Sequence, residues 1–306
     1  MALLKYWGKQ DRPGNFPAAP SISITLDTLA STTSVTPARG NPTDTLTLNG
    51  IATEDAKISA ALSAWRTNLD IPPLVIDTNN NFPTAAGLAS SASGFAALVT
   101  AIDAACELQL QPSELSRLAR IGSGSAARSI HGGFVALAPP TWQAKQLATP
   151  EHWPLTVAVA ITDTGPKTVS SSAGMERSRT TSPYYSAWVQ NNSRSFDTFI
   201  RAIAERNFSE LAELSEASCL DMHALMLSSR PGLIYWRPAT LACIHRVREL
   251  RAAGVPVFFT VDAGPQIKAI CQPDALDAVC SALAKLGGVH QVLRTGLGRG
   301  ARLVAP

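Results

Sequence analysis

Residues 82–98, FPTAAGLASSASGFAAL, place a proline, small residues and paired serines at the beginning of an apolar helical pattern. Small residues let the backbone approach a ligand closely, and the first turn of a helix has amide groups without intrahelical partners. These amides and the positive end of the helix dipole suit a polyphosphate. The lysine of a P-loop, GxxxxGK[ST], is absent. A helix cap that packs through Ala and Gly therefore stays open as the alternative.

The composition is typical of a globular protein. The 306 residues are 45% hydrophobic and 16% charged, which suits one or two domains with apolar cores. The 26 basic and 23 acidic residues give a net charge of +3 without a long basic run, so a nucleic acid partner is not expected. No secretory signal and no run of about 18 apolar residues is present, so no membrane segment is expected either.

Cysteine spacing favours a reducing compartment. The five cysteines form no CxxC pair, and no histidine is spaced for a zinc site. An odd number of cysteines without a signal peptide predicts free thiols that act as small core residues in a cytoplasmic protein. No metal site is predicted. The cysteines are Cys106, Cys219, Cys243, Cys271 and Cys280.

Apolar periodicity predicts an α+β chain in two halves, joined near residues 163–167, with domains at 1–165 and 166–306. In the first half, strands are expected on both sides of the turn ARGNPTD within 21–49, at 74–78, 132–138 and 155–162, and helices at 53–68, after 90 and from a capping Ser113. In the second half, helices are expected at 183–227, 238–253 and 273–286, a strand at 255–261, and two strands around a Gly-rich turn at 292–304.

A second small-residue loop lies in IGSGSAARSIHGG, residues 121–133. Ser123, Gly124 and Ser125 are followed by Arg128, and a guanidinium that converges with hydroxyl groups makes a strong oxyanion site. A flexible turn with a solvated arginine is the alternative interpretation.

Two further stretches carry charged groups. In LLKYWGK, Lys5 and Lys9 flank two aromatic residues, so an amine can be held against a ring and directed into a site, although an amphipathic strand end is equally consistent. In VPVFFTVDAGP, an apolar strand ends at Asp262, a position from which a rigid element can project a catalytic carboxylate. A turn residue before Gly-Pro is the alternative for Asp262.

The order of these motifs resembles a known family. Pro-x-x-x-Gly-Leu-x-Ser-Ser-Ala is the phosphate-loop signature of the GHMP kinase superfamily, and KYWGK, GLASSASGFAAL, GSGSAARS, VSSSAGM and DAGP together resemble the diphosphomevalonate decarboxylase family. The similarity extends from Leu3 to about Pro265. It implies a two-domain GHMP-kinase-type α+β fold, with a half like ribosomal protein S5 domain 2, a ferredoxin-like half, and the active site in the cleft between them.

The resemblance also implies a reaction of isoprenoid biosynthesis. It is the ATP-dependent decarboxylation of mevalonate 5-diphosphate to isopentenyl diphosphate, with release of ADP, phosphate and CO2. Phosphorylation of the tertiary 3-hydroxyl would convert a poor leaving group into a good one, and placed charges would stabilise the developing cation. Mg2+ would be carried with ATP, and the chain would be a homodimer.

Site residues follow from matching positions. The ATP phosphates would be held by Gly87, Leu88, Ser90, Ser91 and Ser93. The reacting groups would be Asp262, Lys5 and Arg128, where Arg128 binds the substrate carboxylate and Asp262 orients or deprotonates the 3-hydroxyl. The rest of the substrate site would be Tyr6, Lys9, Ser123, Gly124, Ser125 and Met175.

Three alternatives remain at this stage. A phosphomevalonate decarboxylase or a mevalonate 3-kinase would act on a substrate with fewer phosphates. The family motif begins with an Asn five residues before the position of Lys5, whereas this sequence begins four residues before it. A catalytically impaired homologue, or a binding protein without activity, is therefore a further expectation. Kinase-only relatives tend to lose the set formed by Asp262, Arg128 and Lys5, and all three are present here.

Overall fold

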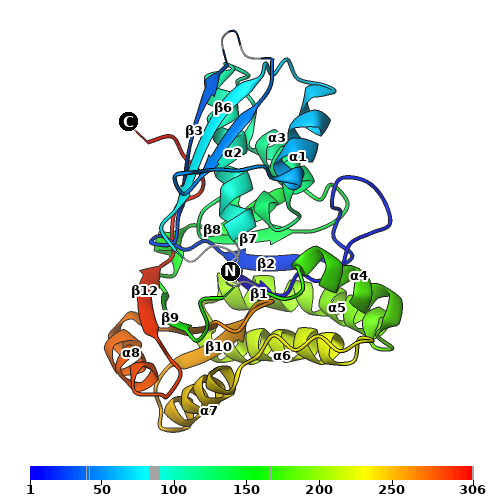
Figure 1. Ribbon diagram of the computed structural model, residues 1–306. Helices are drawn as coiled ribbons and strands as arrows, with labels where there is room; N and C mark the ends of the chain where they lie inside the picture. Colours follow the sequence, from blue (N-terminus) through cyan, green and yellow to red (C-terminus); the bar gives the residue numbers. More distant parts are fainter. Residues whose placement is uncertain (39, 41, 83–89, 166, 305–306) are drawn as a thin grey trace.

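The upper part of the molecule is a sheet with helices packed on one face (Figure 1). The computed structural model describes residues 1–306 except 39, 41, 83–89, 166 and 305–306. The sheet has the order β3 (Ser31–Pro37), β6 (Leu74–Asn80), β4 (Thr45–Leu48) and β5 (Ile51–Ala52), with β4 and β6 parallel. Its helices are α1 (Ala56–Arg66), α2 (Ser90–Ala105) and α3 (Pro112–Gly122). Alternate residues of β6 are buried and exposed, because only the helical side is covered.

A second, antiparallel sheet crosses the middle of the molecule. It has the order β1 (Ala2–Leu4), β2 (Ser21–Ile24), β7 (Phe134–Leu137) and β8 (Ala144–Ala148), with the short 3-10 helices η1 (Ala126–Ile130) and η2 (Pro150–His152) beside it in sequence. In β2, Ile22 and Ile24 belong to the largest core. Since successive side chains of a strand point to opposite faces, Ser21 and Ser23 lie on the other side. Ser23 lines the site described below, and Ser21 accepts a hydrogen bond from Arg128 there.

The lower part contains a third antiparallel sheet. Its order is β10 (Val257–Val261), β11 (Ile267–Cys271), β9 (Thr156–Ile161) and β12 (Gln291–Gly296). Around it are α4 (Ser171–Thr181), α5 (Tyr185–Ala204), α6 (Phe208–Leu227), α7 (Pro238–Ala252), α8 (Leu276–Ala284) and the turn η3 (Pro273–Ala275).

Both faces of this third sheet are buried. Val157, Val159 and Ile161 of β9 pack in the core shared with the middle sheet and α5, whereas Ala158 and Ala160 pack in the core formed with α7 and α8. Strands that are covered on both faces have nearly continuous apolar sequences. This explains why VAVAI and VFFTV look uniformly hydrophobic in the sequence.

Most predicted elements are confirmed, and the α+β class is confirmed with them. The long pattern at 183–227 divides into α5 and α6 around Arg206, which has φ 54°, and Asn207, whose side chain caps α6. The cap predicted at Ser113 is wrong: α3 begins at Pro112, and Gln111 and Glu114 form its capping box. The division at 165/166 stays a prediction. None of the described helices has the length and apolar character needed to span a membrane.

Of the two predicted closing strands, the first is confirmed as β12, and the prediction of the second is wrong. Among the described residues after β12, Leu297 forms an isolated bridge with Leu26, and the segment then continues without strand structure to Val304. Its backbone groups bind other partners. The Gly298 N–H donates to Thr25 O at 2.8 Å, and the Gly298 carbonyl accepts from Gly133 N–H at 2.9 Å. A side chain at Gly298 would lie 2.7 Å from Leu26. Close packing against the middle of the molecule replaces the expected hairpin.

Candidate active site

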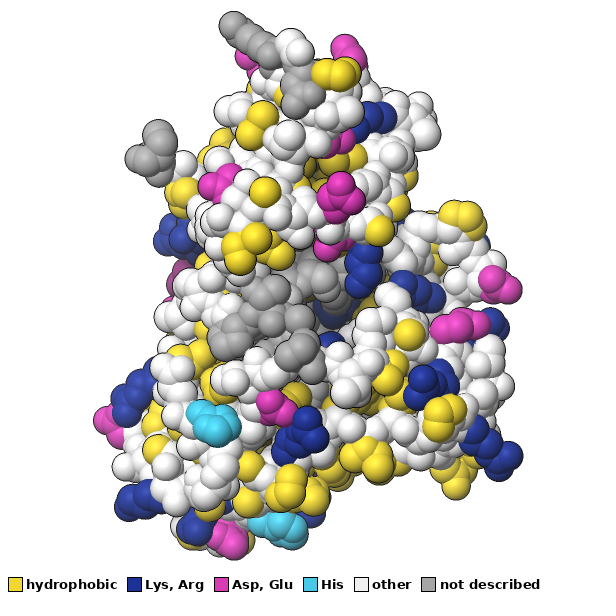
Figure 2. All heavy atoms as spheres, in the orientation of Figure 1, with side chains coloured by type: hydrophobic (Ala, Val, Ile, Leu, Met, Phe, Trp, Pro, Cys, Tyr) yellow, Lys and Arg dark blue, Asp and Glu magenta, His cyan; other side chains and the backbone are white. Residues whose placement is uncertain are grey.

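A cavity of about 890 Å³ lies where the upper, middle and lower parts meet. We call it the central cavity. Its described lining contains six basic residues (Lys9, Lys57, Arg128, Lys167, Arg299 and Arg302) and three acidic ones (Asp27, Glu151 and Asp262). Figure 2 shows Lys and Arg side chains at the junction between the upper and lower parts. The lining also includes many serines. A basic, hydroxyl-rich cavity in a nearly neutral protein suits an anionic ligand.

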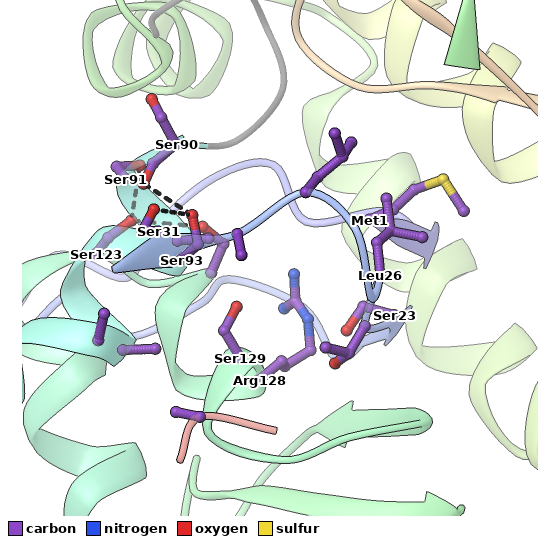
Figure 3. A pocket seen from close by; sticks show the side chains of 18 of the residues that line it. Met1, Ser23, Leu26, Ser31, Ser90, Ser91, Ser93, Ser123, Arg128 and Ser129 are labelled. Carbon is purple, nitrogen blue, oxygen red and sulfur yellow. Dashed lines mark hydrogen bonds between the residues drawn. The ribbon is translucent and has the colours of Figure 1, made fainter. Parts of the chain in front are cut away.

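Serines at the beginning of α2 form one wall of the central cavity. Ser90, Ser91 and Ser93 all line it, and Ser93 Oγ lies 2.7 Å from Ser31 Oγ on β3 (Figure 3). Residues 83–89, with the predicted Gly87 and Leu88, lie outside the described residues. The predicted hydroxyl groups therefore meet at the N-terminal end of a 16-residue helix, where the dipole favours an anion.

The second predicted loop lies directly beside this wall. Ser123 Oγ is 3.4 Å from Ser91 Oγ and 3.4 Å from Ser125 Oγ. A Cβ at Gly124 would lie 2.1 Å from the Tyr6 hydroxyl oxygen, so the glycine lets the Tyr6 ring pack against this loop. The Tyr6 oxygen is buried and has no hydrogen-bond partner among the described residues. Burial raises the pKa of Tyr6, so it is a neutral hydroxyl group at the cavity.

Lys9 is held at the cavity by Asn15. The Lys9 ammonium donates to Asn15 Oδ1 at 2.7 Å and to Ser172 Oγ at 3.4 Å. The Asn15 amide nitrogen donates in turn to Ile121 O at 2.6 Å, at the end of α3. Asn15 has φ 55°, a conformation that asparagine tolerates better than most residues. One side chain thus ties Lys9 to the segment that carries Ser123 and Gly124.

Arg128 points into the cavity from η1, near Ser23 and Ser129 (Figure 3). One of its terminal nitrogens donates to Ser21 Oγ at 2.6 Å, whereas its Nε is buried without a partner among the described residues. Burial lowers the pKa of Arg128 to about 10, so the guanidinium is charged at neutral pH. A buried charged fork with an unused donor suits a carboxylate ligand.

Asp262 lies directly after β10 and contacts two lysines. Lys5 Nζ is 2.7 Å from Asp262 Oδ1, and Lys268 Nζ is 3.3 Å from Oδ2. Burial alone would raise the pKa of Asp262, but the Lys5 and Lys268 ammonium groups outweigh it and hold the pKa well below its usual range. The carboxylate is 20% exposed, whereas Lys5 and Lys268 are 1% and 3% exposed. Asp262 is therefore an ionised group between the cavity and two buried cations.

The beginning of α4 completes the lining. Ser170 caps this helix by accepting from Ala173 N–H, and Lys167 donates to Ser171 Oγ and to Ala263 O, each at 3.0 Å. Met175 lines the cavity one turn further along α4. Lys167 thus links the α4 terminus to the turn that follows Asp262.

The structure brings the described predicted residues together at the central cavity, except Lys5, which is buried and contacts the lining residue Asp262. Sequence reasoning did not identify Asn15, Lys57, Lys167 or Lys268. Lys268 had a recognisable signal, because a lysine in the apolar strand IKAIC is costly to bury without a partner. Asn15 had none, since its role depends on the distance between two loops. Among the described residues, no cluster of three or more His, Cys, Asp or Glu side chains is placed to hold a metal ion.

Both halves of the chain match family models. Residues 1–148 match a diphosphomevalonate decarboxylase-like N-terminal domain, and residues 157–296 match a mevalonate 5-diphosphate decarboxylase C-terminal domain. The matched ranges include Lys5, Arg128 and Asp262.

Individual proteins agree with these matches. The chain is 34% identical to the diphosphomevalonate decarboxylase of Candida albicans, over 98% of this chain and 94% of that protein. A solved structure of MDDEF in complex with MVAPP, AMPPCP and magnesium superposes with a TM-score of 0.91 at 36% identity, covering 98% and 94% of the two chains. The mevalonate diphosphate decarboxylase of Staphylococcus aureus also has a TM-score of 0.91, at 34% identity and the same coverage.

Proposed function

The chain belongs to the diphosphomevalonate decarboxylase family and has its GHMP-kinase-type two-domain fold, and we propose that it catalyses the ATP-dependent decarboxylation of mevalonate 5-diphosphate. The products are isopentenyl diphosphate, ADP, phosphate and CO2. The observation that carries the proposal is a cavity lined by Arg128 and by Asp262, which Lys5 contacts, where the serines of α2 meet those of the Ser123–Ser125 loop.

One anion site is proposed for the ATP phosphates. The hydroxyl groups of Ser90, Ser91 and Ser93 and the N-terminus of α2 would hold them, together with the backbone around Gly87 and Leu88. The similar MDDEF structure contains AMPPCP and magnesium, which supports ATP and Mg2+ as ligands here. Mg2+ prefers oxygen ligands and commonly binds through substrate phosphates, so we propose that it enters with ATP and neutralises phosphate charge beside these serines.

The other site is proposed for the substrate diphosphate. Lys9 supplies an ammonium, Tyr6 an unpartnered hydroxyl, and the loop Ser123–Ser125 further hydroxyl and amide groups. Met175 and the beginning of α4 close the far side of this site. Arg128 would bind the substrate carboxylate through its free donor, at a distance from the diphosphate group.

Asp262 is the residue proposed to contact the reacting oxygen. We propose that the carboxylate orients the 3-hydroxyl toward the γ-phosphoryl group of ATP, with Lys5 held beside it. Transfer forms the bond between the 3-oxygen and phosphorus, breaks the bond to the ADP oxygen, and releases the hydroxyl proton to water. Cleavage of the C3–oxygen bond then releases phosphate, and the electron pair of the carboxylate carbon–carbon bond forms the alkene as CO2 leaves. The negative charge of Asp262 favours a developing cation at C3.

Product analysis tests this function directly. Purified protein with ATP, Mg2+ and mevalonate 5-diphosphate is expected to release ADP, phosphate and CO2 in equal amounts and to form isopentenyl diphosphate. Preference for the monophosphate would support a phosphomevalonate decarboxylase, and ADP without CO2 would indicate a 3-kinase. Substrate binding without turnover would indicate an impaired homologue and contradict the proposal.

We also propose a cytoplasmic homodimer. The resemblance to the family supports the dimer, and four buried free cysteines, Cys219, Cys243, Cys271 and Cys280, support a reducing compartment. Light scattering coupled to size exclusion measures the mass directly, and a monomer mass near 32.3 kDa would contradict the dimer.

A further inference from the structure

Each carboxylate oxygen of Asp262 faces a different ammonium group. Lys5 Nζ contacts Oδ1 at 2.7 Å, and Lys5 also donates to Ala2 O at 3.0 Å. Lys268 lies on β11, and its Nζ is 3.3 Å from Asp262 Oδ2. Lys268 is 3% exposed and does not line the central cavity, whereas Asp262 does. Asp262 therefore links Lys268 to the cavity.

Strand pairing determines where Lys268 points. Ile267, Ala269 and Cys271 pack in the core with α7 and α8, whereas Ile270 packs in the core shared with the middle sheet. Because side chains alternate along a strand, Lys268 lies on the Ile270 side. It pairs in register with Thr260, whose hydroxyl donates to Ala2 O at 3.4 Å. Lys268 is therefore directed toward β1, which Lys5 directly follows.

Stability does not account for a lysine at this position. Desolvation of a buried ion pair costs about as much as the attraction returns, and an apolar residue of similar volume is often as stable or more stable. A second buried cation beside Asp262 also repels Lys5. The contact between Lys268 and Asp262 therefore calls for a role at the cavity.

We propose that Lys268 is a positioning residue for the reaction: it keeps Asp262 ionised and holds the carboxylate with Oδ1 toward Lys5. This inference rests on the proposed function. With a cation on each oxygen, Asp262 has a fixed orientation and a low affinity for protons. A general base works best when its pKa is near the working pH. The pairing with Lys268 therefore favours an orienting, electrostatic role for Asp262 over a role as proton acceptor.

Other titratable groups also face Asp262 and are the same in both proteins of each comparison. They are Lys5 and the Met1 amine at β1, Arg128 on η1, Lys167 before α4, and Cys219 and His223 on α6. Burial lowers the pKa of His223 to about 3, so His223 is neutral at physiological pH. Removal of one cation within about 4–6 Å raises a carboxyl pKa by about one to three units. Loss of Lys268 should therefore raise the pKa of Asp262.

The direct test follows the Asp262 carboxyl carbon by NMR in protein labelled with 13C-carboxyl aspartate, assigned with Asp262→Asn. The experiment is done in a Lys5→Met background, because loss of the Lys5 cation raises the pKa of Asp262 toward the pH range in which the protein stays folded. In that background, Lys268→Met is expected to raise the Asp262 midpoint by about one to three pH units. An unchanged midpoint overturns the proposal. Lys268→Gln repeats the comparison with a neutral polar side chain.

The second test uses steady-state kinetics with Lys5 intact. Lys268→Met is expected to lower kcat about ten- to hundredfold, with the KM values for ATP and mevalonate 5-diphosphate within about twofold of wild type. Lys268→Arg should recover most of the rate. Ile270→Val, a packing change on the same face of β11, is the control. If Lys268→Met and Ile270→Val have equal effects, the proposal is overturned. A wild-type chain without turnover contradicts the proposed function instead, and the titration still decides the role of Lys268.

Discussion

Ser91 Oγ and Ser123 Oγ lie 3.4 Å apart, so the two small-residue loops meet at one pair of hydroxyl groups. Ser91 belongs to the first turn of α2, and Ser123 follows the end of α3. Phosphoryl transfer depends on placing the donor and acceptor oxygens close together and in line. Contact between the loops would place the γ-phosphoryl group of ATP next to the substrate. The following predictions test how the surrounding residues maintain this arrangement.

Asp262→Asn should abolish most turnover while the chain stays folded. The amide has no charge to orient the 3-hydroxyl between Lys5 and the phosphoryl group, and we expect kcat to fall at least about a thousandfold, equivalent to about 4 kcal/mol of barrier. Binding of a fluorescent ADP analogue should be retained. Asp163→Asn, shortly after the end of β9 in the same sheet and outside the described cavity lining, is the control. Near-normal turnover by Asp262→Asn would rule out the assigned role.

Asn15→Ala should weaken binding of the diphosphate substrate selectively. Without the acceptor at 2.7 Å, the Lys9 ammonium loses its fixed position, and the link from Asn15 to Ile121 O is also lost. We expect the KM for mevalonate 5-diphosphate to rise about tenfold, equivalent to about 1.4 kcal/mol, with little change in the KM for ATP. Asn68→Ala, at an exposed position after α1, controls for loss of an asparagine. An equal rise in both KM values would contradict a role confined to the substrate site.

Gly124→Ala should displace Tyr6. The added Cβ would lie 2.1 Å from the Tyr6 hydroxyl oxygen and 3.1 Å from Asn15 O, so the ring or the loop must move. The KM for mevalonate 5-diphosphate is expected to rise at least about tenfold, because misplacement by about 1 Å is enough to disrupt a site. Gly94→Ala in α2, where a Cβ meets no atom of another described residue outside the helix backbone within 4 Å, should leave kinetics unchanged and stabilise the helix by up to about 1 kcal/mol. A Gly124→Ala enzyme with wild-type kinetics would show that Tyr6 has room to move.

His223 should make the fold sensitive to acid. Trp236 donates its indole N–H to His223 Nε2 at 3.2 Å, so this nitrogen is the acceptor, and burial followed by the nearby Lys5 cation lowers the His223 pKa to about 3. An unfolded histidine has a pKa of about 6.5. Between these values the unfolded chain binds a proton that the folded chain does not, so stability falls as pH falls. The loss is about 2 kcal/mol between pH 7 and 5.

Urea unfolding at these two pH values measures this effect. His223→Gln should lose about 2 kcal/mol less stability than wild type on acidification, whereas His245→Gln, at an exposed position on α7, should behave like wild type. Equal acid sensitivity in the wild-type and His223→Gln proteins would show that His223 is not the responsible group.

Most of the helices and strands, the α+β class and the family could be predicted from the sequence. Strands such as β9 and β10 carry apolar runs that only a fully buried strand requires, and the helices after Ser90 and at 238–252 follow apolar periodicity. The motifs around Lys5, Ser91, Ser123, Arg128 and Asp262 were sufficient to identify the family, because their residues and their order along the chain resemble those of the family.

Which of these groups contact one another depends on the tertiary structure and could not be predicted from the sequence. The contact of Ser91 with Ser123, the link from Lys9 through Asn15 to Ile121, and the pairing of Lys268 with Asp262 join segments far apart in the sequence. Local patterns carry no information on such distances, since they depend on sheet register and on the packing between layers. The same reason explains the wrong hairpin at the end of the chain: glycines that suggest a turn serve instead for close approach to Leu26 and Ile130.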